Sequence, residues 1–92
     1  MRYNRQSGKD GVLRQLREDG GILMMLSDEL QSDKDIVLTA VKQNGCALNH
    51  ASDELKDDKE VVLAAVRQNA GAYLFASDRL KQDLDVMLVA EM

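Results

Sequence analysis

The sequence has no proline and no tryptophan, and its only aromatic residues are Tyr3, Tyr73 and Phe75. Because proline breaks a helix interior, its absence favours uninterrupted helices. With so few rings, the core has to be built from Leu, Val, Ile, Ala and Met. A chain of 92 residues has the length of one domain with a modest core.

Cysteine and histidine are equally scarce, with one of each, Cys46 and His50. A single cysteine excludes a disulfide within the chain and fits a reducing compartment. No apolar run approaches the ~18 residues of a membrane helix, and residues 1–8 lack the apolar stretch of a signal peptide. We therefore expect a cytoplasmic protein without a membrane segment.

Charge is unevenly distributed along the chain, whose net charge is −4. Residues 1–17 carry five basic side chains and one acidic one, whereas residues 18–92 are strongly acidic. An acidic bulk argues against a duplex-binding module, which needs a basic surface. Nucleic acid is therefore not the expected main partner.

The chain repeats itself every 25 residues. The segment 27–30, Ser-Asp-Glu-Leu, recurs at 52–55 and, with Arg in place of Glu, at 77–80. Segments 27–50 and 52–75 are identical at more than half of their positions without a gap. A fixed internal period of this length is typical of stacked helical repeats.

One repeat predicts a long helix followed by a short one. Asp33 is the expected N-cap of the long helix, and Gly45 is expected to stop it because glycine adopts positive φ at low cost. Apolar residues cover about 200° of this helix, which suits packing between two neighbours. Leu55 is expected to be the buried anchor of the loop that leads to the next repeat.

We therefore predict an all-α fold of tandem 25-residue repeats, stacked as a small solenoid-like bundle of about seven helices. The predicted organisation is a flexible segment 1–8 and a repeat domain 9–92, with repeats at 9–32, 33–57, 58–82 and a partial repeat at 83–92. Long helices are expected at about 9–19, 33–44, 58–69 and 83–91, and short helices at about 21–27, 46–52 and 71–77. Leu63, in a central long helix, is expected to be deeply buried.

The repeat resembles a known family. The stretch 58–69, Asp-Lys-Glu-Val-Val-Leu-Ala-Ala-Val-Arg-Gln-Asn, with Ala76-Ser77 after it, is similar to the helical repeat catalogued as domain of unknown function 4116. Residues 33–52 match nearly as well, and the resemblance covers about residues 9–90. It implies small α-helical repeats with interaction as the default role, and it implies no activity, cofactor or catalytic residue.

Few residues in the sequence are candidates for catalysis or metal binding. Cys46 and His50 are four residues apart, so on an α-helix they would share a face and suit a metal or a thiol–imidazole pair, but no second ligand pair accompanies them. The acidic segments 28–35 and 53–60 lack the glycine and spacing of a calcium loop, so helix capping accounts for them better. We expect no catalytic residue, no metal, no cofactor and no enzymatic activity.

Two sets of residues remain as candidates for binding. Arg17, Lys42 and Arg67 occupy one repeat position and form a basic ladder, which either complements the helix dipoles or binds an anionic ligand. Two positions on the short helices differ most between copies and either face a partner or lie at a loosely packed edge: Met24, Met25, Asn49, His50, Leu74 and Phe75.

The last long helix has no short helix after it in this sequence. An apolar helix surface is not expected to stay bare in water, so either another chain packs there or the natural protein continues. We expect self-association through Val86, Leu88 and Val89. The leading expectation for function is a protein–protein interaction or self-assembly module. The alternative is nucleic-acid or anionic-ligand binding through the basic N-terminal residues and the ladder.

Overall fold

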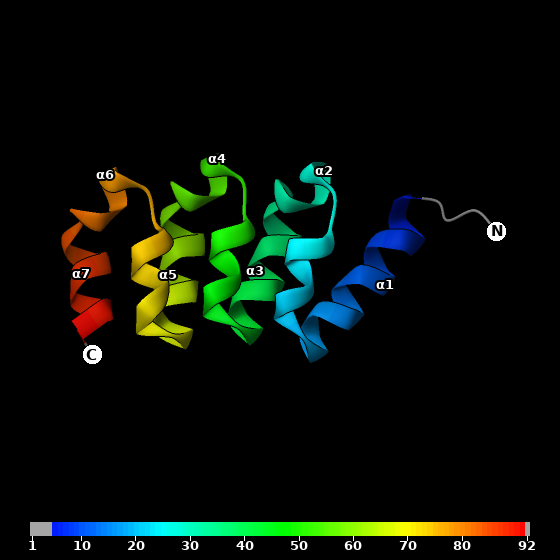
Figure 1. The fold of residues 1–92 in the computed structure, drawn as a ribbon, viewed down its shortest axis with the longest axis horizontal. Coiled ribbons are helices and arrows are strands. Elements are labelled where there is room, and N and C mark those ends of the chain that lie inside the picture. The colour runs from blue at the N-terminus through cyan, green and yellow to red at the C-terminus, as the bar shows by residue number, and fades with distance from the viewer. Residues whose placement is uncertain (1–4, 92) are drawn as a thin grey trace.

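The computed structural model describes residues 5–91, and every regular element in that range is helical. Four long helices lie side by side along an elongated body of 47 × 22 × 17 Å (Figure 1). They are α1 (Arg5–Glu18), α3 (Lys34–Gln43), α5 (Lys59–Gln68) and α7 (Leu84–Glu91). The predicted all-α repeat stack is confirmed.

Each long helix except α7 is followed by a six-residue 3₁₀ helix and then by a single α-helical turn. The 3₁₀ helices are η1 (Gly20–Met25), η2 (Gly45–His50) and η3 (Ala70–Phe75). The one-turn helices are α2 (Asp28–Gln31), α4 (Asp53–Lys56) and α6 (Asp78–Lys81), which run along one edge of the stack (Figure 1). The sequence predicted the short helices but treated the one-turn helices as loops, so residues 5–91 hold ten helical elements instead of about seven.

The one-turn helices form because each has a serine N-cap. Ser27, Ser52 and Ser77 each accept a hydrogen bond from the backbone amide three residues later. Backbone hydrogen bonds then join neighbouring repeats, from Ser52 N to Gln31 O and from Ser77 N to Lys56 O, each 3.0 Å long. This edge is therefore tied together by main-chain contacts.

The predicted caps of the long helices are confirmed. The Asp33 carboxylate accepts from the amides of Asp35 and Ile36, and the Asp58 carboxylate accepts from Val61. α1 begins at Arg5, four residues before the predicted start. Of the segment 1–8 predicted to be flexible, residues 1–4 lie outside the described residues and residues 5–8 belong to α1.

Gly45 was expected to adopt positive φ at the end of the long helix, and this expectation is wrong. No glycine among the described residues has positive φ. Gly45 is instead required by close packing, because a Cβ there would lie 2.3 Å from the carbonyl oxygen of Ala65 in the next long helix. Gly20 meets Ala40 in the same way, so these glycines let η1 and η2 approach the following repeat.

The core is aliphatic and continuous through the stack. The two central long helices each bury four residues at one set of repeat positions, Ile36, Val37, Ala40 and Val41 in α3 and Val61, Val62, Ala65 and Val66 in α5. Leu55 is buried as predicted. Leu63 is only half-buried, so its predicted deep burial is wrong, because it lies beyond the arc that the neighbouring helices cover.

Candidate interaction surface

The three 3₁₀ helices pack side by side and carry the variable positions predicted to face a partner. We call this set of six side chains the η ridge: Met24, Met25, Asn49, His50, Leu74 and Phe75. Met24 and Leu74 occupy one repeat position and are exposed, as is Asn49 between them. At the next position Met25 is 78% exposed, whereas His50 and Phe75 are half-buried. The structure therefore places the predicted residues in two rows along the stack, one of which is exposed throughout while the other is exposed only at Met25.

The η ridge is held in place by capping side chains. Asp19, Asn44 and Asn69 end the long helices and accept hydrogen bonds from the amides two residues later, at 2.9, 3.1 and 2.8 Å. Glutamine side chains from the following repeat complete the junction. The Oε1 atom of Gln43 accepts from Gly20 N at 2.8 Å, and that of Gln68 accepts from Gly45 N at 2.5 Å.

Cys46 and His50 do not form the pair that an α-helix would create. They lie on η2, where three residues per turn separate positions four apart by roughly 120° instead of placing them on one face. The Cys46 sulfur accepts a hydrogen bond from Asn69 Nδ2 at 3.4 Å. Residues 5–91 contain no group of three His, Cys, Asp or Glu side chains arranged to hold a metal.

The aspartates of the acidic segments cap helices and form ion pairs with lysines. Lys9, Lys34 and Lys59 are spaced by 25 residues and form a lysine ladder that the sequence reading missed, although the period alone would have revealed it. Lys34 Nζ lies 3.1 Å from Asp58 and 2.8 Å from Glu60 in the next repeat. Lys9 bridges to Asp33 and Asp35, and Lys59 bridges to Asp83 and Asp85, in the same geometry.

This lysine ladder shifts the protonation of the capping carboxylates. Partial burial acts to raise the pKa of Asp58, but the hydrogen bond from Lys34 and those from the helix amides outweigh it and hold that pKa below its ordinary value. The pKa values of Asp33 and Asp83 are lowered against burial for the same reason. Hydrogen bonds to Glu60 and Asp58 in turn raise the pKa of Lys34.

The basic ladder lies near the opposite ends of the long helices. Arg17, Lys42 and Arg67 are exposed in the last turns of α1, α3 and α5. Arg17 and Lys42 line one surface depression with Thr39 and Gln43. Lys42 and Arg67 line the next with Ala64 and Gln68. The ladder thus borders successive shallow depressions along one edge.

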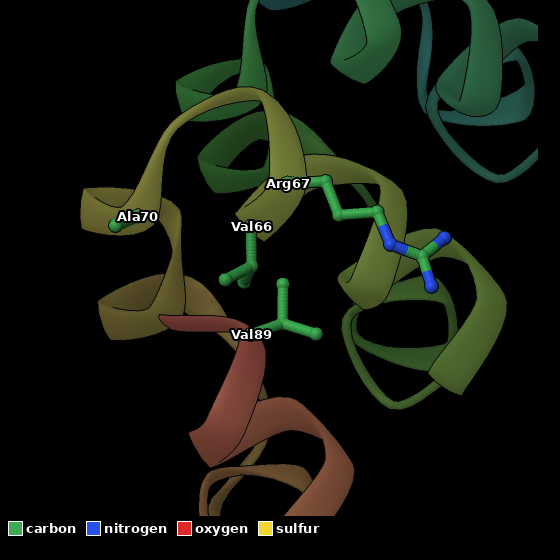
Figure 2. Close-up of a pocket in the computed structure, with 4 residues that line it drawn as sticks. All are labelled: Val66, Arg67, Ala70 and Val89. Carbon is green, nitrogen blue, oxygen red and sulfur yellow. The ribbon is translucent and has the colours of Figure 1, made fainter. Parts of the chain in front are cut away.

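A larger hollow of about 500 Å³ lies at the last junction, between α5, η3 and α7. Figure 2 shows Val66 and Val89 facing each other across it, with Arg67 pointing away and Ala70 on the adjoining turn. Ala70 stands at the repeat position of Gly20 and Gly45. In the described part of the chain this junction lacks both that glycine and the glutamine link, and it keeps the larger hollow.

The residues predicted for self-association are only partly accessible. Val86 is fully buried, so it contacts the core and is not available to a second chain. Val89 is half-buried and Leu88 is 60% exposed. The prediction for Val86 fails because the helix turns this residue toward α5, and the sequence reading overlooked exposed Leu84 and Met87 on the same helix.

None of the helices in residues 5–91 is long and apolar enough to cross a membrane. Comparisons of the chain with curated proteins and with solved structures gave no match. The chain matches the family described as Domain of unknown function (DUF4116) twice, over residues 12–56 and 58–90. The two matches cover most of the chain and lie in tandem, and the protein therefore belongs to this family.

Proposed function

We propose that the chain is a protein-interaction module that binds its partner through the η ridge. The observation that carries this proposal is the exposure of Met24, Met25 and Leu74 on a face that is otherwise rigidly held by caps and inter-repeat hydrogen bonds. Methionine and aromatic side chains are enriched in the centres of protein interfaces. Exposed apolar side chains on adjacent elements of a small domain mark such sites.

The η ridge fits a partner with two apolar anchors separated by a polar contact. Met24 and Met25 form one apolar end, Leu74 forms the other, and Asn49 lies between them. Methionine is flexible and polarizable and adapts to irregular partner surfaces. The framework beneath varies little between repeats, so differences in the η ridge are free to set partner choice.

The proposed role is binding and not catalysis. Cys46 and His50 are the only thiol and imidazole in the sequence, and η2 turns them to different sides. A nucleophile would need a base within hydrogen-bond reach. The single free Cys46 also supports a proposed cytoplasmic location, where thiols stay reduced.

The test compares two triple variants in a quantitative capture experiment from extracts of the source cells. The first variant combines Met24→Ser, Met25→Ser and Leu74→Ser. It should lower the amount of captured protein at least tenfold, while its helix content, measured by circular dichroism, stays unchanged. The matched control replaces three exposed basic residues, as Arg17→Gln, Lys42→Gln and Arg67→Gln. Equal capture by wild type and the η-ridge variant would contradict the proposal.

One observation favours a second candidate, the binding of an anionic ligand. The basic ladder borders two successive depressions that also contain the amides of Gln43 and Gln68. If this edge binds polyanions, affinity for heparin should be measurable at low salt and fall steeply as salt rises. The basic-ladder variant should then lose heparin binding, and the η-ridge variant should keep it.

A further inference from the structure

The two ends of the stack present different faces, and burial identifies the residues on each. Ile36 and Ala40 of α3 are fully buried, but their equivalents in α1, Gly11 and Gln15, are exposed. Since α1 has no preceding helix among the described residues, these positions face the previous repeat. The outward face of α1 is therefore small and polar.

The same comparison identifies the outward face of α7. Val62 and Val66 of α5 are buried, whereas their equivalents Met87 and Glu91 are exposed. These positions face the next repeat. Leu84, which is 73% exposed, and Leu88 extend this face into an apolar patch that adjoins the Glu91 carboxylate.

From these two faces we infer that a second copy of this chain stacks its α1 on α7, continuing the repeat in register from one molecule to the next. The ion pairs from Lys34 to Asp58 and Glu60 indicate the register of the internal junction. That register places position 37 near position 61 and position 41 near position 65, as valine against valine and valine against alanine. Across the new junction the same register pairs Met87 with Gly11 and Glu91 with Gln15.

The substitutions at the two ends compensate each other. Met87 carries a long side chain and would face Gly11. A Cβ placed at Gly11 would have no neighbouring atom within 4 Å, so this position has room for the methionine. Glu91 meets Gln15, whose amide can donate to the carboxylate. Arg14, which is exposed on α1, also offers a positive charge to Glu91.

A two-fold pairing of two α7 helices fits less well. An antiparallel pair centred on Met87 and Leu88 would place each Glu91 beside the Leu84 of the other copy. That arrangement sets a carboxylate against a leucine and gives Glu91 neither the Gln15 amide nor the Arg14 charge that head-to-tail stacking offers. Head-to-tail stacking is heterologous, so it predicts open-ended assembly that grows with concentration.

The test uses one variant for each face of the full chain. Gly11→Glu blocks α1 with bulk and negative charge, and Met87→Lys blocks α7 with a positive charge opposite the basic α1. Wild type should show an average mass that rises with concentration in sedimentation equilibrium. Each variant alone should remain monomeric at concentrations where wild type associates, and both should keep wild-type helix content.

Mixing the two variants is the decisive step. Equimolar Gly11→Glu and Met87→Lys should associate, because the native α7 of the first variant can stack on the native α1 of the second. At the other junction the introduced glutamate and lysine carry opposite charges. Self-association of Gly11→Glu alone would support the two-fold pairing and overturn the inference. A monomeric wild type at 100 µM, or a mixture that stays monomeric, would also overturn it, while the η-ridge proposal would be unaffected.

Discussion

The junction between the second and third long helices and the junction between the third and the last are built from the same sequence pattern but close differently. Where η2 meets α5, Gly45 lies against the Ala65 carbonyl and Gln68 reaches back to the Gly45 amide. Where η3 meets α7, Ala70 replaces the glycine and a hollow lined by Val66 and Val89 remains. The junction with the glycine and the glutamine link is therefore the more tightly closed one, and the junction where the described residues supply neither keeps the larger hollow.

The largest effect on the free energy of unfolding is expected when Gly45, at the junction of η2 and α5, is replaced by alanine, the residue found at the junction of η3 and α7. Gly45→Ala should destabilise the protein by about 3 kcal/mol, because the new methyl meets a backbone oxygen and not a movable side chain. Chemical denaturation measures the change. The matched control is Gly11→Ala, whose Cβ lies in open space on α1 and which should stabilise the protein by about 0.5–1 kcal/mol. Equal effects of the two variants would refute the packing role of Gly45.

The next prediction compares the loss of stability on alanine substitution at Val62 and at Met87, which occupy the same repeat position in α5 and α7. Val62 is fully buried between α5 and its neighbours, whereas the equivalent Met87 is 38% exposed. Val62→Ala should cost about 2 kcal/mol and Met87→Ala less than about 1 kcal/mol, although methionine loses more atoms. Both values should come from denaturation of monomeric protein. If Met87→Ala cost more, the assignment of α7's outward face would be wrong.

The glutamine link should contribute less than the core. Gln68→Ala leaves the Gly45 amide without its acceptor and should cost about 1–2 kcal/mol. Hydrogen exchange at the Gly45 amide should accelerate more than at amides of α1. Unchanged exchange at Gly45 would show that the link contributes nothing in solution.

The smallest effect concerns pH. The pKa values of Asp33, Asp58 and Asp83 are lowered in the folded state. The unfolded chain therefore takes up protons first, so stability is full above the unfolded pKa of about 4 and is lost as pH falls through the folded pKa values. Lys34→Met should narrow the difference in stability between pH 7 and pH 2, because the Asp58 carboxylate loses its ammonium partner. An unchanged difference would mean that the ion pair has no influence on Asp58.

The period of 25 residues was enough to predict the repeat stack, the capping role of Asp33 and the burial of Leu55. It did not predict the 3₁₀ form of the short helices, because the choice between three and 3.6 residues per turn depends on the Asn44 cap and on the Gly45 contact, both set by the next repeat. The lysine ladder was visible in the same period. The exposure of Met87 and the burial of Val86 were not, because they depend on which side of α7 is covered.

Residue-level hydrogen exchange, measured at a concentration where the chain is monomeric, tests the contrast between the closed and open junctions most directly. Amides of α5, packed on both sides, should exchange only through global unfolding. Amides of α7, packed on one side with a hollow beneath, should exchange through local opening, at least tenfold faster. Equal protection of α5 and α7 would contradict the account.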